Sequence, residues 1–239
     1  SGWSVSLSAD GTRVAIGARL NDGTGSNAGH VRIYEYSAGS WTQLGADIDG
    51  EAVNDESGFS VSLSSDGTTV AIGAHWNGGA GASAGHVRIY EYSAGSWTQL
   101  GADIDGEASG DQSGSSVSLS SDGTTVAIGA HFNEGAGTAA FNSNAGHVRI
   151  YEYSAGSWTQ LGADIDGEAA GDYSGSSVSL SSGGDTVAIG ARRNDGNGTD
   201  AGHVRIYEYS AGSWTQLGAD IDGEAAQDNS GYSVSLSSD

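Results

Sequence analysis

A 23-residue segment, HVRIYEYSAGSWTQLGADIDGEA, occurs four times in this chain without a single change, beginning at His30, His86, His147 and His203. A second phrase, SG-x-SVSLS, begins at Ser1, Ser57, Ser113, Ser174 and Ser230, which gives repeat lengths of 56, 56, 61 and 56 residues. Periods of this size are typical of propellers, solenoids and linear arrays. We therefore divide the chain into four repeats, 1–56, 57–112, 113–173 and 174–229, and interpret 230–239 as the first strand of a fifth repeat or as a closing strand.

The apolar residues inside each repeat have the two-residue period of β-strands. Val31 and Ile33 alternate with Arg32 and Tyr34, and no segment of the chain has a helical period. Asp-Gly and Ala-Gly pairs mark tight turns, and two longer loops complete each repeat. We predict an all-β fold in which each repeat is a four-stranded antiparallel sheet and the sheets form a β-propeller-type array. A linear β-array is the alternative.

The composition argues against two classes of partner. Eight basic residues face 30 acidic ones, and the resulting net charge of −22 repels nucleic-acid phosphates and anionic lipid headgroups. The hydrophobic content of 36% allows a packed core, but the chain has no apolar run of the roughly 18 residues that a spanning helix needs. We therefore expect neither nucleic-acid binding nor membrane insertion. The absence of cysteine excludes disulfides and thiolate metal sites.

The repeat resembles the FG-GAP repeat family, which forms the blades of integrin α-subunit propellers and of bacterial and algal surface proteins. The resemblance rests on the SVSL strand after a glycine, on the AGHVRIY strand, and on the VAIGA runs at Val14–Ala18, Val70–Ala74, Val126–Ala130 and Val187–Ala191. It covers all four repeats. It implies a propeller, an extracellular or cell-surface location as a fragment of a longer secreted chain, and a role in adhesion or ligand capture.

The chain departs from this family at the family's calcium loop. That loop has the form D-x-D-x-D-G-x-x-D, because calcium takes several oxygen ligands. The corresponding connection is only Ser65-Asp66-Gly67 in the second repeat, so we do not carry the family's calcium over to it.

Two other segments carry oxygen ligands that suit calcium. Asn194, Asp195, Asn197 and Asp200 lie among glycines in the fourth repeat, although the matching loops of the other repeats contain fewer acids. The DIDGE segment at 47–51, with its copies, contains three acids, but such acids also form Asx turns or solvated charge. Calcium is therefore a candidate cofactor whose site the sequence does not fix.

The sequence offers little to a catalytic mechanism. Four of the six histidines begin the invariant segment, where a structural role is the simpler interpretation. Serine and aspartate are so abundant that any proposed triad or carboxylate pair would be arbitrary. We therefore predict that the protein is not an enzyme.

The differences between repeats fall in two connections and in the residue that enters the first strand. In an antiparallel blade, the loop between the second and third strands and the connection to the next repeat lie on the same face. This face carries Arg19, Leu20, His75, Trp76, His131, Phe132, Arg192 and Arg193. Arginines and aromatic rings suit glycans and acidic partners, so we predict a binding or adhesion module for a glycan or a surface protein. Neutral drift of the loops, in a structural array or spacer without a small ligand, is the alternative.

Four repeats are few for a closed ring, and an open stack leaves apolar faces on its terminal sheets. We expect one of three outcomes. Further repeats complete a larger ring, another copy of the chain associates with this one, or residues 230–237 replace the N-terminal strand in a closing blade.

Overall fold

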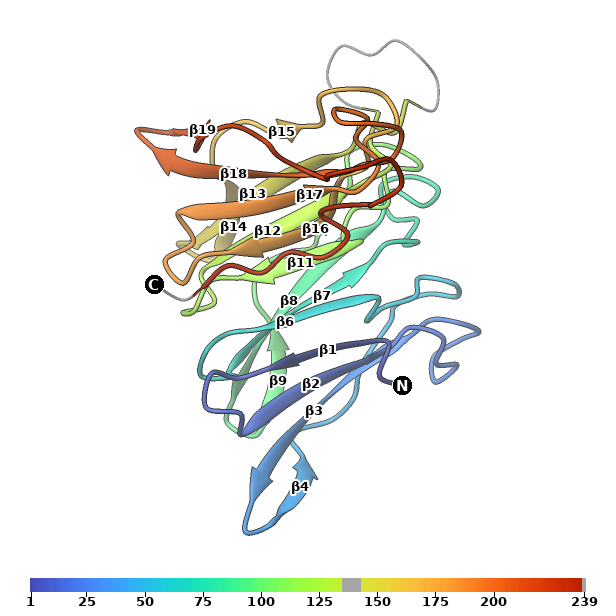
Figure 1. The fold of residues 1–239 in the computed structure, drawn as a ribbon. Helices are drawn as coiled ribbons and strands as arrows, with labels where there is room; N and C mark the ends of the chain where they lie inside the picture. The colour runs from blue at the N-terminus through green and yellow to red at the C-terminus, as the bar shows by residue number, and fades with distance from the viewer. Residues whose placement is uncertain (135–142, 238–239) are drawn as a thin grey trace.

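The computed structural model of the chain describes residues 1–134 and 143–237. These residues form β-strands that build four antiparallel sheets of five strands each. The sheets follow one another from the N-terminal to the C-terminal end of the molecule (Figure 1). Among the described residues, no helix is long and apolar enough to cross a lipid bilayer. The predicted all-β fold of repeated blades is confirmed.

The four sheets have the same strand order. The first contains β1 (Ser4–Leu7), β2 (Arg13–Ala18), β3 (His30–Ser37), β4 (Ser40–Gln43) and β5 (Ile48–Asp49). The second contains β6 (Ser60–Leu63), β7 (Thr69–Ala74), β8 (His86–Ser93), β9 (Ser96–Gln99) and β10 (Ile104–Asp105). The third contains β11 (Ser116–Leu119), β12 (Thr125–Ala130), β13 (His147–Ser154), β14 (Ser157–Gln160) and β15 (Ile165–Asp166). The fourth contains β16 (Ser174–Leu180), β17 (Thr186–Ala191), β18 (His203–Ser210), β19 (Ser213–Gln216) and β20 (Ile221–Asp222).

The structure differs from the prediction in the fourth strand of each repeat. The sequence predicts four strands per repeat, but the last of them is divided in two: β4 ends at Gln43, and β5 pairs separately with the start of β3. Gly45 lies between them with a φ of 76°, a left-handed conformation that interrupts an extended strand. The break places Asp47 and Asp49 beside His30.

The hydrophobic core lies between neighbouring sheets. Ile33 of β3 and Val70 of β7 are fully buried in the layer between the first two sheets, and similar layers follow between the later ones. The invariant glycine of VAIGA permits this close approach. A Cβ atom at Gly17 would lie 2.1 Å from the carbonyl oxygen of Gly58, which belongs to the next repeat.

The first strands of the repeats, β1, β6, β11 and β16, lie side by side along the inner edge of the stack (Figure 1). Their leucines line one shared groove of about 200 Å³: Leu7, Leu63, Leu119 and Leu180, followed by Leu236. The faces at the two ends of the stack are uncovered, since Leu7 of β1 is 61% exposed and Ile221 of β20 is 55% exposed. The blades therefore form an open arc of the propeller type.

Residues 230–236 do not replace β1, which was one of the three expected outcomes. They run along β16 instead, where Ser177 Oγ donates to the carbonyl oxygen of Gly231 at 2.7 Å and the amide of Leu236 donates to Ser179 Oγ at 3.0 Å. This segment therefore occupies the position of the inner strand of a fifth blade. β1 pairs with β2 over its whole length, which leaves no room for a second strand there.

Candidate functional site

The loops that differ between repeats lie on one face of the arc. In the first repeat the amide of Asn54 donates to the carbonyl oxygen of Ser26, which joins the two variable connections. The turns after the first strands form a separate row, in which the amide of Ala9 donates to the carbonyl oxygen of Ser65. We call the surface of residues 18–27 and 53–56, with their counterparts in the other repeats, the variable face. Of these counterparts, 135–142 lie outside the described residues.

Cationic and aromatic side chains meet at the N-terminal end of the variable face. The guanidinium carbon of Arg19 lies 4.0 Å from the centre of the Trp3 ring, and Arg19 Nη1 lies 2.5 Å from Glu56 Oε2. The next pair of rings, Phe59 and His75, has centres 3.8 Å apart, and His75 is 4% exposed. Trp3 and Arg19 belong to the first repeat, and Phe59 and His75 belong to the second. The guanidinium carbon of Arg19 lies 5.9 Å from the centre of the Phe59 ring, so Arg19 joins the two pairs across the contact between blades.

A second cluster surrounds Tyr173 near the C-terminal end of the variable face. The ring centre of Phe132 lies 5.3 Å from that of Tyr173. The guanidinium carbons of Arg192 and Arg193 lie 5.3 Å and 4.7 Å from the same ring centre. The ring centre of His131 lies 5.9 Å from that of Tyr173, so four of the predicted binding residues gather around an aromatic ring that is not among the predicted ones.

The remaining predicted residues differ in their exposure. Leu20 and Trp76 are exposed, whereas His131 is half-buried with its Nδ1 2.8 Å from Ser115 Oγ. The eight predicted residues therefore share one face but do not form one site. Trp3, Phe59 and Tyr173 also lie in the segments that differ between repeats. The sequence does not show their partners, because the contact of Trp3 with Phe59 and that of Tyr173 with Arg192 cross from one repeat to the next.

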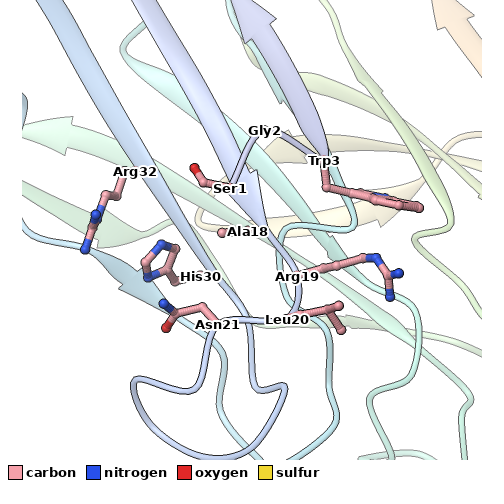
Figure 2. A pocket seen from close by; sticks show the side chains of 9 residues that line it. All are labelled: Ser1, Gly2, Trp3, Ala18, Arg19, Leu20, Asn21, His30 and Arg32. Carbon is pink, nitrogen blue, oxygen red and sulfur yellow. The ribbon is translucent and has the colours of Figure 1, made fainter.

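A pocket of about 470 Å³ opens at the N-terminal end of the arc. Its lining comes from residues 1–3 and 18–21, together with His30 and Arg32 of β3 (Figure 2). Of the predicted binding residues, it includes only Arg19 and Leu20.

The predicted calcium loop of the fourth repeat uses several polar groups within the fold. Asn194 Oδ1 and Asp195 Oδ1 each accept a hydrogen bond from a loop amide at 2.8 Å, and for Asp195 the donor is the amide of Asp200. The side-chain amide of Asn197 donates to the carbonyl oxygen of Gly223 at 2.9 Å. These bonds account for the residue types in the loop, and calcium binding there stays a prediction.

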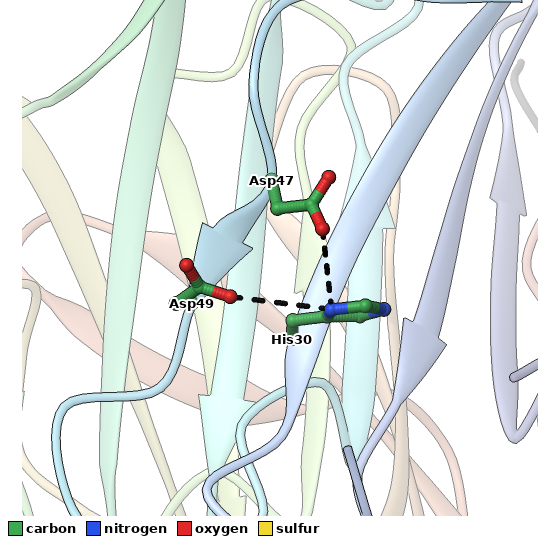
Figure 3. A group of neighbouring side chains, drawn as sticks. All are labelled: His30, Asp47 and Asp49. Carbon is green, nitrogen blue, oxygen red and sulfur yellow. Dashed lines mark ion pairs between the residues drawn. The ribbon is translucent and has the colours of Figure 1, made fainter. Parts of the chain in front are cut away.

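A histidine and carboxylates come together at the start of the third strand of each sheet. Figure 3 shows His30, whose Nδ1 lies 3.5 Å from an oxygen of Asp47 and 4.0 Å from one of Asp49. In the later sheets a glutamate of the preceding repeat joins the group, as Glu107 does beside His147. Burial lowers the pKa of His147 to about 4, so this ring is neutral at pH 7. The sequence does not show these groups. The pairing of β5 with β3 brings Asp47 and Asp49 beside His30, and in the later sheets the contact between blades adds the glutamate.

Comparison with protein families identifies one FG-GAP repeat, at residues 163–207, which confirms the resemblance for that segment. The matched residues run from the end of the third repeat into the fourth and include part of the invariant segment. The comparison with curated protein sequences gave no match.

Three solved structures share the fold at low sequence identity. A putative 6-phosphogluconolactonase from Bacteroides uniformis matches with a TM-score of 0.60 and 13% identity, over 92% of this chain and 54% of that one. The periplasmic gluconolactonase PpgL of Pseudomonas aeruginosa has a TM-score of 0.57 and 16% identity, over 92% and 56%. Hydrazine synthase of Kuenenia stuttgartiensis has a TM-score of 0.55 and 13% identity, over 90% and 53%. The chain therefore spans about half the length of these structures.

These neighbours correct the prediction that the protein is not an enzyme. Two of the three are lactonases by name, so blades of this architecture occur in enzymes. The prediction relied on the absence of a recognisable catalytic motif, which is a poor guide because a fold hosts many functions. At 13% and 16% identity the likeness concerns the fold, and no lactonase residue or reaction is transferred to this chain.

Proposed function

We propose that the protein is an extracellular or cell-surface binding module whose variable face takes acidic glycans. The observation that carries this proposal is the stacking of Arg192 and Arg193 on Tyr173. Within the described part of the chain, neither arginine forms an ion pair. Unpaired guanidinium groups bind carboxylates strongly, and flanking rings provide stacking area for sugars.

The charge of the whole chain makes these two arginines unusual. The net charge of −22 repels an anion over most of the surface, and the chain contains only eight basic residues. Arg193 is exposed, and so is Trp76, at 47%. A uronic-acid oligosaccharide offers the carboxylates and the sugar faces that such side chains bind.

Titration calorimetry with a uronic-acid oligosaccharide and with its neutral counterpart tests this proposal. We expect saturable binding of the acidic sugar and an affinity at least about tenfold lower for the double variant R192A/R193A, since charge-assisted hydrogen bonds are the strong ones. The matched control is R13A, whose arginine pairs with Glu35 on β3 and lies away from the variable face. Lack of saturable binding, or an unchanged affinity in the double variant, would contradict the proposal.

A structural array is the second candidate, and the exposed terminal sheets favour it. Val5 and Leu7 of β1 are 64% and 61% exposed, whereas the matching Val61 and Leu63 are 9% and 7% exposed between blades. At the other end Ile221 is 55% exposed, and its counterparts inside the stack are 5% exposed. The two end faces are the two halves of one blade-to-blade contact, so a second copy of this chain fits head to tail.

Light scattering after size-exclusion chromatography tests the array. We expect concentration-dependent dimers or longer species, which I221D should reduce to monomers. V53D is the control, because Val53 is 58% exposed in a loop away from the end faces. A chain ending at Asn229 should associate at lower concentration, since residues 230–236 occupy the place of an incoming β1. A wild-type chain that stays monomeric at about 100 µM, where interfaces of this kind are populated, would contradict the array.

A further inference from the structure

His203 has no hydrogen-bond partner for either ring nitrogen, although its side chain is only 1% exposed. Its Nδ1 faces carboxylates, with Asp220 Oδ2 at 3.7 Å and Glu168 Oε2 at 4.0 Å. These distances are too long for hydrogen bonds. They are close to the separations of roughly 3–4 Å between ligand atoms that bind one metal ion at about 2 Å each.

Both carboxylates are held so that one oxygen remains free to face His203. Gln216 Nε2 donates to Asp220 Oδ1 at 2.6 Å, which leaves Oδ2 toward the ring. Arg205 Nη1 lies 3.7 Å from Glu168 Oε1, which leaves Oε2 toward the ring. Neighbours that orient ligand groups in this way are typical of metal sites.

The same arrangement recurs at the other two contacts between sheets. His147 Nδ1 lies 3.7 Å from Asp164 Oδ2 and 3.8 Å from Glu107 Oε2, and Gln160 holds the other oxygen of Asp164. The third group consists of Glu51, His86 and Asp103. In every group the histidine and the aspartate belong to one repeat and the glutamate belongs to the preceding repeat.

We propose that these three groups are divalent transition-metal sites, with zinc as the preferred ion, located at the contacts between blades. Their ligand sets are Glu51, His86 and Asp103; Glu107, His147 and Asp164; and Glu168, His203 and Asp220. One imidazole and two carboxylates match zinc, whereas calcium prefers oxygen ligands alone. Three protein ligands leave one tetrahedral position for water or an external ligand.

The first repeat provides an internal control for the proposal. His30 has Asp47 and Asp49 nearby but no glutamate from a preceding repeat. Arg32 instead donates to both oxygens of Asp47, at 2.9–3.0 Å, and so occupies the carboxylate that a metal would need. The chain should therefore bind three zinc ions tightly rather than four.

Native mass spectrometry of the chelator-treated chain with zinc chloride tests the proposal, and titration calorimetry gives the affinities. We expect three ions per chain, two in H203A, none in H86A/H147A/H203A, and still three in H30A. Cobalt should replace zinc and give the visible absorption of a four-coordinate N/O site.

The conservative variant E168Q covers the case in which a histidine variant unfolds. It keeps the size of the side chain but loses its charge, so it should weaken one of the three sites at least about tenfold while the other two are unchanged. Two results would overturn the proposal: absence of zinc binding at micromolar concentration in the folded wild-type chain, or three tightly bound ions in E168Q or in the triple variant.

Discussion

The indole nitrogen of Trp97 in the second sheet donates a hydrogen bond to the carbonyl oxygen of Leu44 in the first sheet, at 2.8 Å. Trp158 and Trp214 make the same bond to the repeats that precede them. Trp41 has the same neighbours in sequence but no preceding sheet, and it is 47% exposed. The same tryptophan of the repeat is therefore bonded to a neighbouring sheet in three repeats and exposed in the first. A comparison of the two positions measures what the contact between blades contributes to stability.

Replacement of Trp97 by phenylalanine should destabilise the protein, and the same change at Trp41 should not. W97F removes the donor to the Leu44 carbonyl and part of the packing, at a cost of about 1–3 kcal/mol. W41F changes an exposed ring, so we expect an effect within about 0.5 kcal/mol. Urea unfolding of both variants measures the difference, and equal losses of stability would show that the bond between blades contributes nothing.

The glycine of VAIGA should tolerate no side chain. A Cβ atom at Gly73 would lie 2.1 Å from the carbonyl oxygen of Gly114, so G73A has to push two blades apart. We expect a loss of about 3 kcal/mol from this overpacking. Gly78 is the control, because the nearest atom to its Cβ would be 3.9 Å away, and G78A should change stability by less than about 0.5 kcal/mol. Thermal unfolding of both variants is the measurement.

Asp55 links the variable connection of the first repeat to the loop of the second. Its Oδ2 accepts from the amide of Ala52 at 2.9 Å and from the Asn77 side chain at 3.0 Å, and Asp55 is 3% exposed. D55A should cost about 2–3 kcal/mol, because the buried Asn77 amide loses its acceptor. Asp228 is exposed and accepts a hydrogen bond from the backbone amide of Ala225, without a second bond like that from Asn77. D228A should therefore cost less than about 1 kcal/mol. A similar loss in the two variants would contradict a role for the link between repeats.

The antiparallel sheets could be predicted from the sequence because the residues that specify each strand and turn are neighbours in the chain. The alternation around Val31 and Ile33 and the tight turns specify antiparallel strands from neighbouring residues alone. The break at Gly45 was missed because glycine is common throughout the chain, and the left-handed φ at that position is not visible in the pattern. The Trp97–Leu44 bond spans 53 residues, and identical repeats give no indication of which residues meet.

The candidate site also depends on contacts between repeats, which the sequence pattern does not show. The variable face could be predicted because loop connectivity in a meander decides the face on which each loop lies. The cluster of Arg192 and Arg193 around Tyr173 could not, since Tyr173 comes from the preceding repeat. The groups that contain His86, His147 and His203 were missed for the same reason, because each needs a glutamate from another repeat.

Stability should fall as the pH decreases from 7 to 5, and His75 should cause part of the fall. Burial lowers the pKa of His75 from 6.5 to about 3. Between these values the unfolded chain binds a proton that the folded chain does not, so the contribution of His75 is complete above pH 6.5 and declines as the pH falls. Linkage then predicts that this one group lowers the free energy of unfolding by about 2 kcal/mol between pH 7 and 5. The H75F variant should not show this part of the decrease. Urea unfolding of wild type and H75F at both pH values measures this share, and parallel pH profiles would show that the His75 ring titrates alike in the folded and the unfolded chain.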